Sequence, residues 1–192
     1  MMTGAPAVRV AIDLVQVPSR VRRYRDGPLP GGVETILRIA AGVEGAEAEA
    51  AAAVGRPPEL VRRAAAFFIE QILLSSDADS YRVLGADDTA TAAQLRHNMA
   101  LLLRWLHPDV DRLGVRSLFA GRVTEAWETL KTPERRAAYD LERSANGAGG
   151  RRPKRRQRVK RHARGAGPHH PAWGEEPEGF LRRAVRRLMR GS

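Results

Sequence analysis

The chain has 192 residues, contains no cysteine and carries a formal net charge of +11. This length suits one or two small domains, and the lack of cysteine excludes disulfides, a thiol nucleophile and cysteine-ligated metal sites. Residues 151–192 contain 14 basic and 3 acidic side chains, whereas the 19 basic and 19 acidic side chains of residues 1–150 cancel. The basic character therefore belongs to a C-terminal tail and not to the body of the protein.

The N-terminal segment alternates between apolar and other residues. Over residues 7–17, Val8, Val10, Ile12 and Leu14 occupy every second position, which predicts a single β-strand. Arg9 and Asp13 interrupt the apolar run, so we expect no signal peptide. With no apolar stretch long enough to cross a bilayer, we expect a cytoplasmic protein.

Helical patterns dominate after the turn-rich segment at residues 26–32. We expect helices at residues 33–41, 45–54 and 59–75, and the last of these buries an apolar stripe that includes Phe67, Phe68 and Ile72. Further helices are predicted at residues 80–84, from Thr89 or Thr91 to Leu106, at 115–130, and from Pro133 to 142. Residues 146–150 are predicted to be a flexible exit from the last helix.

The tripeptide His107-Pro108-Asp109 lies between two of these predicted amphipathic helices. On its own it is a weak signal, because Asp109 and His107 are typical of a turn that ends one helix and caps the next segment. If the two helices pack as an antiparallel hairpin, however, the tripeptide is displayed at the connecting loop, where core packing does not explain it.

The surrounding sequence resembles the J domain of DnaJ-like co-chaperones. Residues 80–85 (SYRVLG) resemble its Tyr-x-x-Leu-Gly opening, residues 92–106 its second helix, residues 123–130 (VTEAWETL) its third helix, and residues 133–140 (PERRAAYD) its fourth. The resemblance covers about residues 78–143. It implies that His107, Pro108 and Asp109 contact a DnaK-type ATPase chaperone and stimulate its ATP hydrolysis, while the chain itself is not an enzyme.

The second helix departs from this family in its charge. J domains usually display several basic residues on the exposed face of this helix, toward an acidic partner surface. Arg96 matches one such position and Arg104 adds a cation near the loop, but residues 99–101 read Met-Ala-Leu. Fewer exposed cations predict weaker docking. Alternatively, Leu101 and Leu103 face the N-terminal helices, and the J domain is part of a larger helical body.

The tail has two parts. Residues 144–178 are predicted to be a flexible polybasic linker that contacts nucleic acid or an anionic membrane surface, or that only improves solubility. The candidate polyanion-binding residues are Arg151, Arg152, Lys154, Arg155, Arg156, Arg158, Lys160 and Arg161. Residues 179–192 predict a basic amphipathic helix, which suits a membrane surface, a partner groove or the protein's own apolar surface.

The sequence thus predicts a mainly α-helical protein with a J-domain helical hairpin and short flanking helices. Its regions are an N-terminal helical region (1–77), a J domain (78–143), the linker and the terminal helix. Without cysteine or a Gly/Phe-rich segment, the chain resembles the J-domain-only class, whose energy source is the partner's ATP and whose client is an unfolded protein. No motif for a cofactor, a metal or a catalytic site is present. The alternative function is a J-like scaffold that does not activate a chaperone and whose tail binds nucleic acid or membrane.

Overall fold

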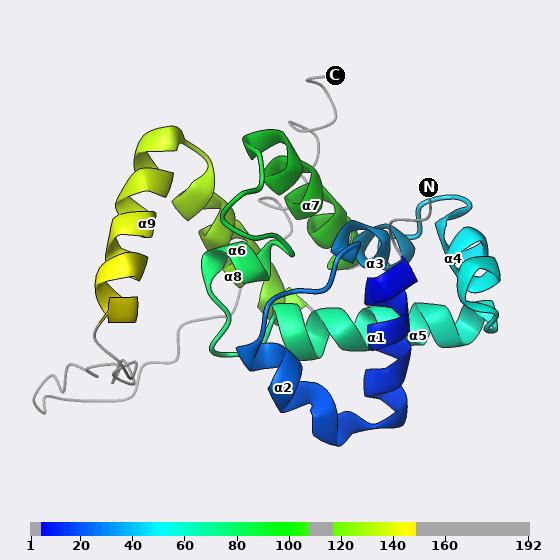
Figure 1. Cartoon of the computed structure of the whole chain (residues 1–192). Helices are drawn as coiled ribbons and strands as arrows, with labels where there is room; N and C mark the ends of the chain where they lie inside the picture. The colour runs from blue at the N-terminus through cyan, green and yellow to red at the C-terminus, as the bar shows by residue number, and fades with distance from the viewer. Residues whose placement is uncertain (1–4, 108–116, 149–192) are drawn as a thin grey trace, which may run out of the picture.

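The computed structural model describes residues 5–107 and 117–148, and within these ranges all regular structure is helical (Figure 1). The N-terminal part contains α1 (Ala5–Gln16), the 3-10 turn η1 (Pro18–Arg20), α2 (Val21–Asp26), α3 (Val33–Ala40), α4 (Ala46–Val54), α5 (Pro58–Phe68) and the π-helical turn η2 (Ile69–Leu73). The second part contains α6 (Ser80–Val83), α7 (Ala92–Trp105), α8 (Ser117–Leu130) and α9 (Pro133–Ala148). The predicted fold class is confirmed.

The β-strand predicted for residues 7–17 is wrong, because this segment forms α1. Its fully buried residues include Ala7, Val8, Ala11 and Leu14, which recur with the three-to-four-residue spacing of a helix face. The valines alone suggest alternation, and the helical spacing becomes visible only when the buried Ala7 and Ala11 are counted as core residues. α1 packs across α5, where small side chains allow the two helices to approach closely.

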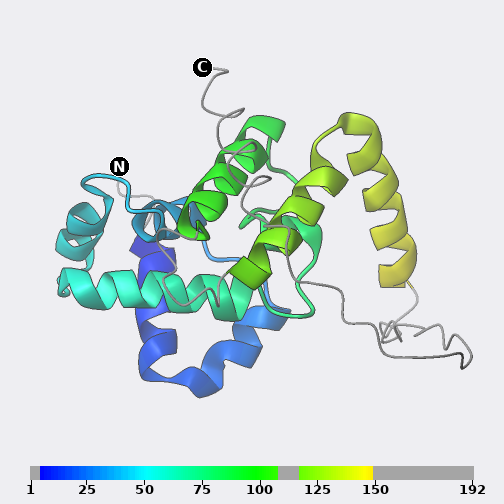
Figure 2. The same ribbon diagram turned by 180° about the vertical axis from the view of Figure 1, so that it is seen from behind.

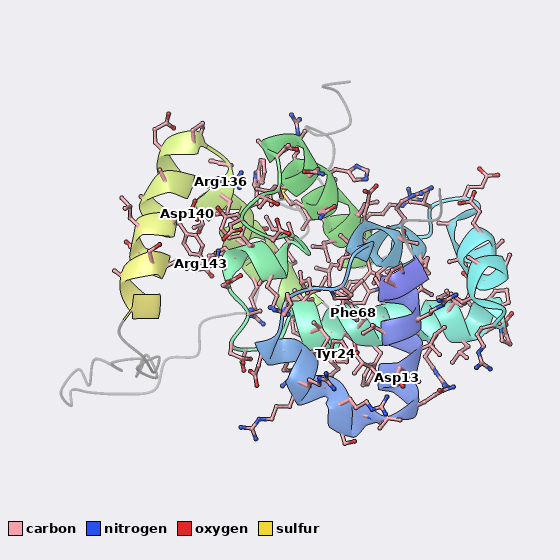
Figure 3. All side chains as sticks on the ribbon, viewed as in Figure 1. Asp13, Tyr24, Phe68, Arg136, Asp140 and Arg143 are labelled. Atoms are coloured by element: carbon pink, nitrogen blue, oxygen red, sulfur yellow. The ribbon has the colours of Figure 1, made fainter. Side chains whose placement is uncertain are left out.

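α5 is the centre of the N-terminal part, and α1, α3 and α4 all pack against it. The predicted helix at residues 59–75 is confirmed in outline, but its last turn widens into the π-helical turn η2. Phe68 has no exposed surface and Phe67 is partly buried, as expected for core residues. Figure 3 shows Phe68 among the helices of this part, with Asp13 and Tyr24 on α1 and α2.

The second part is built on α7 and α8, which pack side by side, with the short α6 against α8. α9 lies at the edge of the molecule away from α4, as both Figure 1 and Figure 2 show. α9 continues to Ala148, beyond the predicted end at residue 142, so the predicted flexible exit at residues 146–150 is wrong up to Ala148. No proline lies between Pro133 and Ala148, and Gly147 falls in the last turn, where its low helix propensity costs little.

One hydrophobic cluster joins the two parts. Arginines reinforce this junction by donating to backbone carbonyls across it: Arg82 of α6 reaches Tyr24 O at 3.1 Å and also Gly27 O, and Arg122 of α8 reaches Ser75 O at 2.6 Å and also Leu74 O. Each guanidinium donates to carbonyls at helix ends and in loops, and Ser75 O also accepts from the N–H of Ala78 at 3.0 Å. The N-terminal helices and the α6–α9 helices therefore share one folded body.

Candidate partner-binding site

The N-terminus of α7 is fixed by a capping box. The backbone N–H of Gln94 donates to Thr91 Oγ1 at 3.2 Å, and the N–H of Thr91 donates to Gln94 Oε1 at 2.8 Å. Of the two predicted caps, Thr91 is therefore the one used. Thr89 instead donates its hydroxyl to Asp87 Oδ1 at 2.6 Å, and this hydrogen bond lowers the pKa of Asp87.

α7 ends at Trp105, and its C-cap residue Leu106 precedes His107. The N–H of Leu106 donates to Leu102 O at 2.9 Å, and the half-buried His107 donates its own N–H to Arg104 O at 3.3 Å. The histidine is thus held by the last turn of α7, at the start of the α7–α8 connection. Pro108 and Asp109 lie outside the described residues, so the structure gives a position for the first member of the tripeptide only.

The two predicted docking arginines both lie on α7 with exposed side chains. Arg104 donates Nη2 to Gly42 O at 3.3 Å, which links it to the loop after α3. Arg96 stands two turns earlier. Both cations are therefore exposed on the helix that precedes His107, but Arg104 is also a contact to the N-terminal part.

The packing of α3 explains why α7, the second helix of the J-domain pattern, has no basic residue at positions 99–101. α3 packs against α7, and Leu101 and Leu103 are only 8% and 3% exposed. Leu101 shares a side of α7 with His97, which pairs with Glu34 of α3 at 3.5 Å. The alternative in which this helix faces the N-terminal helices is confirmed for that side. A lysine or arginine at position 101 would have to be taken out of water there.

The tryptophans of α7 and α8 both pack against the core. Trp105 is 3% exposed, and Trp127 is partly buried against the core. On α8, Val123, Ala126 and Leu130 are buried and form the stripe that faces the rest of the hairpin. These residues hold α8 against α7 and so set the geometry from which the connection at residues 106–116 begins.

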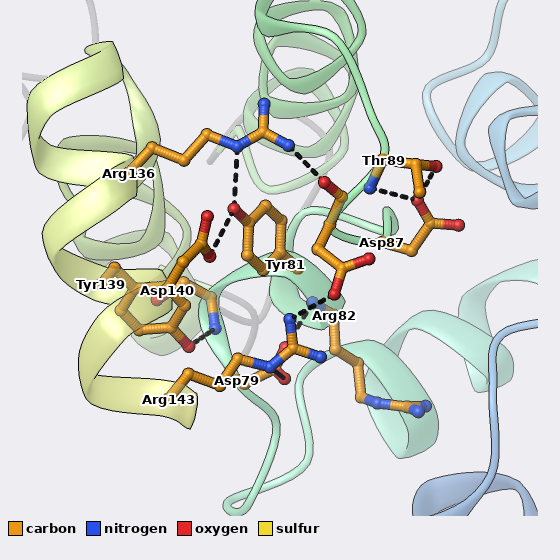
Figure 4. A network of polar contacts seen from close by, with 11 residues as sticks. Asp79, Tyr81, Arg82, Asp87, Thr89, Arg136, Tyr139, Asp140 and Arg143 are labelled. Carbon is orange, nitrogen blue, oxygen red and sulfur yellow. Dashed lines mark hydrogen bonds and ion pairs between the residues drawn. The ribbon is translucent and has the colours of Figure 1, made fainter. Parts of the chain in front are cut away.

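A polar network fastens α9 to α6 at the other end of the hairpin (Figure 4). The Tyr81 hydroxyl donates to Asp140 Oδ1 at 2.8 Å and accepts from Arg136 Nε at 2.8 Å. The Tyr81 and Tyr139 rings meet edge to face at 5.8 Å, and the Tyr139 hydroxyl accepts from Ser80 N at 3.0 Å. Burial and then the bond to Asp140 raise the pKa of Tyr81.

Arg136 and Arg143 extend this network to the loop before α7. Arg136 donates to Ala90 O and Asp88 O, both at 2.7 Å, and Arg143 lies 3.1 Å from Asp88 Oδ2. Sequence analysis did not predict these contacts of the two arginines. Arg136 lies within the PERRAAYD segment and Arg143 lies three residues after it. The carbonyls that Arg136 binds lie 46 and 48 residues away in sequence, so the segment itself does not indicate them.

The polyanion-binding candidates Arg151 to Arg161, the predicted linker and the predicted helix at residues 179–192 all lie outside the described residues. Among residues 5–107 and 117–148, the structure contains no group of three or more His, Asp or Glu side chains placed to hold a metal ion. Within the same ranges, every helix is too short or too polar to cross a membrane.

Comparison with known proteins gives a family match over the same helices. Residues 79–140 match the DnaJ domain family model. The chain is 38% identical over 73 residues to human DnaJ homolog subfamily C member 16, and 37% identical over 65 residues to the chaperone protein DnaJ of Halalkalibacterium halodurans. It is also 37% identical over 73 residues to chaperone protein dnaJ 20, chloroplastic, of Arabidopsis thaliana.

These matches cover 38%, 34% and 36% of this chain, and 9%, 18% and 37% of the respective relatives. The chain thus spans well under half the length of each of these three relatives. No solved structure matches the chain. The helices and the family match agree on a J-domain region at residues 79–140. The matched range contains the whole His107-Pro108-Asp109 tripeptide.

Proposed function

We propose that this protein is a co-chaperone that binds a DnaK-type chaperone and stimulates its ATP hydrolysis through His107, Pro108 and Asp109. The observation that carries the proposal is the intact tripeptide within a DnaJ domain match that begins at residue 79 and ends at residue 140. The position of His107, next to the C-cap of α7 and bonded to its last turn, supports it further, because the packed hairpin gives the connection a rigid base.

In this proposal the protein supplies no catalytic group of its own. Binding of the tripeptide favours the hydrolysis-competent state of the partner, which requires a higher affinity for that state than for the resting one. The imidazole of His107 and the carboxylate of Asp109 offer a hydrogen-bond donor and an acceptor, and Pro108 restricts the backbone between them. An unfolded client protein is the substrate that the partner then retains.

Single-turnover ATP hydrolysis by the DnaK-type chaperone of the source organism tests the proposal. We expect the wild-type protein to accelerate hydrolysis and the His107→Gln variant to lose this effect, with an unchanged circular dichroism spectrum. The matched control is His162→Gln, which makes the same chemical change outside the DnaJ domain match. If folded wild-type protein gives no acceleration, or if His107→Gln accelerates as well as wild type, the proposal is wrong.

A second candidate function is a J-like scaffold whose basic tail binds nucleic acid or an anionic membrane. The burial of Leu101 against the N-terminal helices favours it, because part of the second helix is committed to internal packing. The concentrated charge of residues 151–192 supplies the electrostatic contact. Affinity for duplex DNA should then fall steeply with added salt, since each neutralised phosphate releases counterions. Absence of binding at physiological salt to both DNA and anionic vesicles would eliminate this candidate.

A further inference from the structure

A pocket of about 400 Å³ lies at the junction between the N-terminal helices and the α6–α9 helices. One wall is formed by residues 29–34, which lead into α3, and the other by the α6–α7 loop with Gln94 and Asn98 of α7. The walls meet closely, since a Cβ on Gly85 would lie 3.0 Å from Val33 Cγ1. The volume is in the range of small-ligand sites, and the pocket exists only because the two parts share one folded body.

Asn98 is the buried polar residue of this junction pocket and is only 7% exposed. Its Nδ2 donates to Leu84 O at 2.9 Å and to Gly85 O at 3.4 Å, which fixes the orientation of the amide. Among the described residues nothing donates to its Oδ1, although none of their fully buried side-chain nitrogens or oxygens lacks a hydrogen bond. Oδ1 therefore keeps a small exposed area toward the pocket that Asn98 lines, where it is an acceptor without a donor.

Two carboxylates line the same pocket, Glu34 on the α3 wall and Asp87 on the opposite wall. Thr89 donates its hydroxyl at 2.6 Å and its N–H at 2.9 Å to Asp87 Oδ1, and these hydrogen bonds lower the pKa of Asp87, so that it stays ionised. Glu34 has His97 Nε2 at 3.5 Å, and both of these side chains are more than half exposed. None of the described residues that line the pocket is basic, so its walls carry a negative charge that they do not neutralise.

The arginines of α9 bind the other side of the α6–α7 loop. Arg136 donates to Ala90 O and Asp88 O, and Arg143 pairs with Asp88. Figure 4 shows Asp87 on the side of this network away from α9. The two guanidinium groups are therefore committed to contacts outside the pocket.

Apolar side chains complete the lining of the pocket: Leu29, Val33, Ala86 and Ala90. Such a surface accommodates the aliphatic stem of a long basic side chain while the charged end of that side chain reaches the acceptors. A guanidinium suits these acceptors better than an ammonium group does, because its planar fork donates to an amide oxygen and to a carboxylate at the same time.

We propose that the junction pocket binds the guanidinium group of an arginine side chain from a polypeptide segment. Asn98 Oδ1 accepts from one of its N–H groups, and the carboxylates of Asp87 and Glu34 balance its charge. The segment is either the arginine-rich tail of this chain, residues 151–164, or another polypeptide. The inference does not depend on the proposed co-chaperone function, because it concerns the junction and not the His-Pro-Asp tripeptide.

Nuclear magnetic resonance titration of the full isotope-labelled chain tests the site, with Nα-acetyl-arginine amide as the probe. We expect saturable shifts of the backbone amides of Gly31 and Ala86 and of the side-chain amide of Asn98. The citrulline analogue has nearly the same shape without the charge and should bind about tenfold more weakly. Asp87→Asn keeps an oxygen that accepts from Thr89 and should weaken binding of the arginine probe about three- to fivefold.

Glu34→Gln is the second variant and should weaken binding by about twofold or more, since Glu34 is exposed. The matched control is Glu59→Gln, because Glu59 is exposed on α5 and does not line the pocket. The proposal is wrong if the pocket amides show no saturable shift, or if the citrulline analogue binds as well as the arginine probe. It is also wrong if Asp87→Asn and Glu34→Gln both bind the probe like the control.

A further variant of the full chain, with the arginines of residues 151–164 replaced by glutamine, identifies the source of the side chain. If the tail occupies the pocket, this variant binds the probe more tightly than wild type, and its pocket amides are already shifted without the probe. Equal binding by this variant and by wild type assigns the site to another polypeptide. Because the measurement is binding at the junction, failure of the protein to stimulate ATP hydrolysis would leave this result unchanged.

Discussion

Replacing Arg136 with alanine tests whether α9 is held by the polar network shown in Figure 4. Arg136 donates hydrogen bonds to the Tyr81 hydroxyl at 2.8 Å and to the carbonyls of Ala90 and Asp88 at 2.7 Å, and its guanidinium carbon lies 5.2 Å from the centre of the Tyr81 ring. These contacts connect α9 with α6 and with the loop that precedes α7. The side chain is only partly buried, so water compensates part of what its removal costs.

Hydrogen bonds from charged donors contribute roughly 1.5–3 kcal/mol each when they are buried, and less where water replaces the donor. For three such bonds in a half-buried position we expect Arg136→Ala to lower the free energy of unfolding by about 2–3 kcal/mol. For a folded body of this size, that corresponds to a fall in Tm of about 5–10 °C. Urea unfolding followed by far-ultraviolet circular dichroism, together with a thermal scan, measures both quantities.

The neighbouring Arg135 provides the control. It is exposed and contacts Glu128 at 2.9 Å on the surface, so Arg135→Ala should cost less than about 1 kcal/mol. The reasoning is refuted if Arg136→Ala unfolds at the same urea concentration as Arg135→Ala. In that case the aromatic and apolar contacts of Tyr81 and Tyr139 alone would hold α9 in place.

Two further substitutions test the packing between the two parts. Leu101→Lys should lower the free energy of unfolding by about 2–4 kcal/mol, because the ammonium group is forced toward α3. The control Ala100→Lys, on the more open side of α7, should be tolerated. Equal urea midpoints for the two variants would contradict this packing. Gly85 has a φ of +64°, and a Cβ there would lie 3.0 Å from Val33 Cγ1, so Gly85→Ala should cost about 2–3 kcal/mol from backbone strain and overlap together. Gly55→Ala, at a φ of +62° with open space around it, should show the backbone cost alone, about 1 kcal/mol, and the difference between the two variants in urea unfolding checks the overlap.

The sequence predicted the helices between residues 33 and 142 well because their apolar residues follow the helical period and their ends carry local signals. Thr91 with Gln94 and the Thr132-Pro133 pair are such signals, and both mark a helix start in the structure. The segment at residues 7–17 failed because a short valine-rich run satisfies both the strand and the helix period. Packing against α5 favours the helix, but α5 lies far away in the sequence. The sequence of residues 7–17 therefore contains no signal of this contact.

The candidate site could be predicted in part. His107 was placed correctly at the end of a helix, and the resemblance to the J domain is confirmed by the family match. Several contacts that position the hairpin could not be predicted, because they join an arginine or asparagine to a backbone carbonyl far away in sequence. Asn98, for example, is buried on α7 and donates to Leu84 O at 2.9 Å, yet its sequence position shows only a polar residue beside an apolar stripe.

The small number of exposed cations on α7 is connected with the packing of α3 against this helix. A J domain whose second helix faces water on its outer side can carry basic residues at every turn of that side. Here α3 covers the side that includes Leu101, so a charge at that position would oppose folding. The cations that remain on α7, Arg96 and Arg104, stand where α3 leaves the helix open.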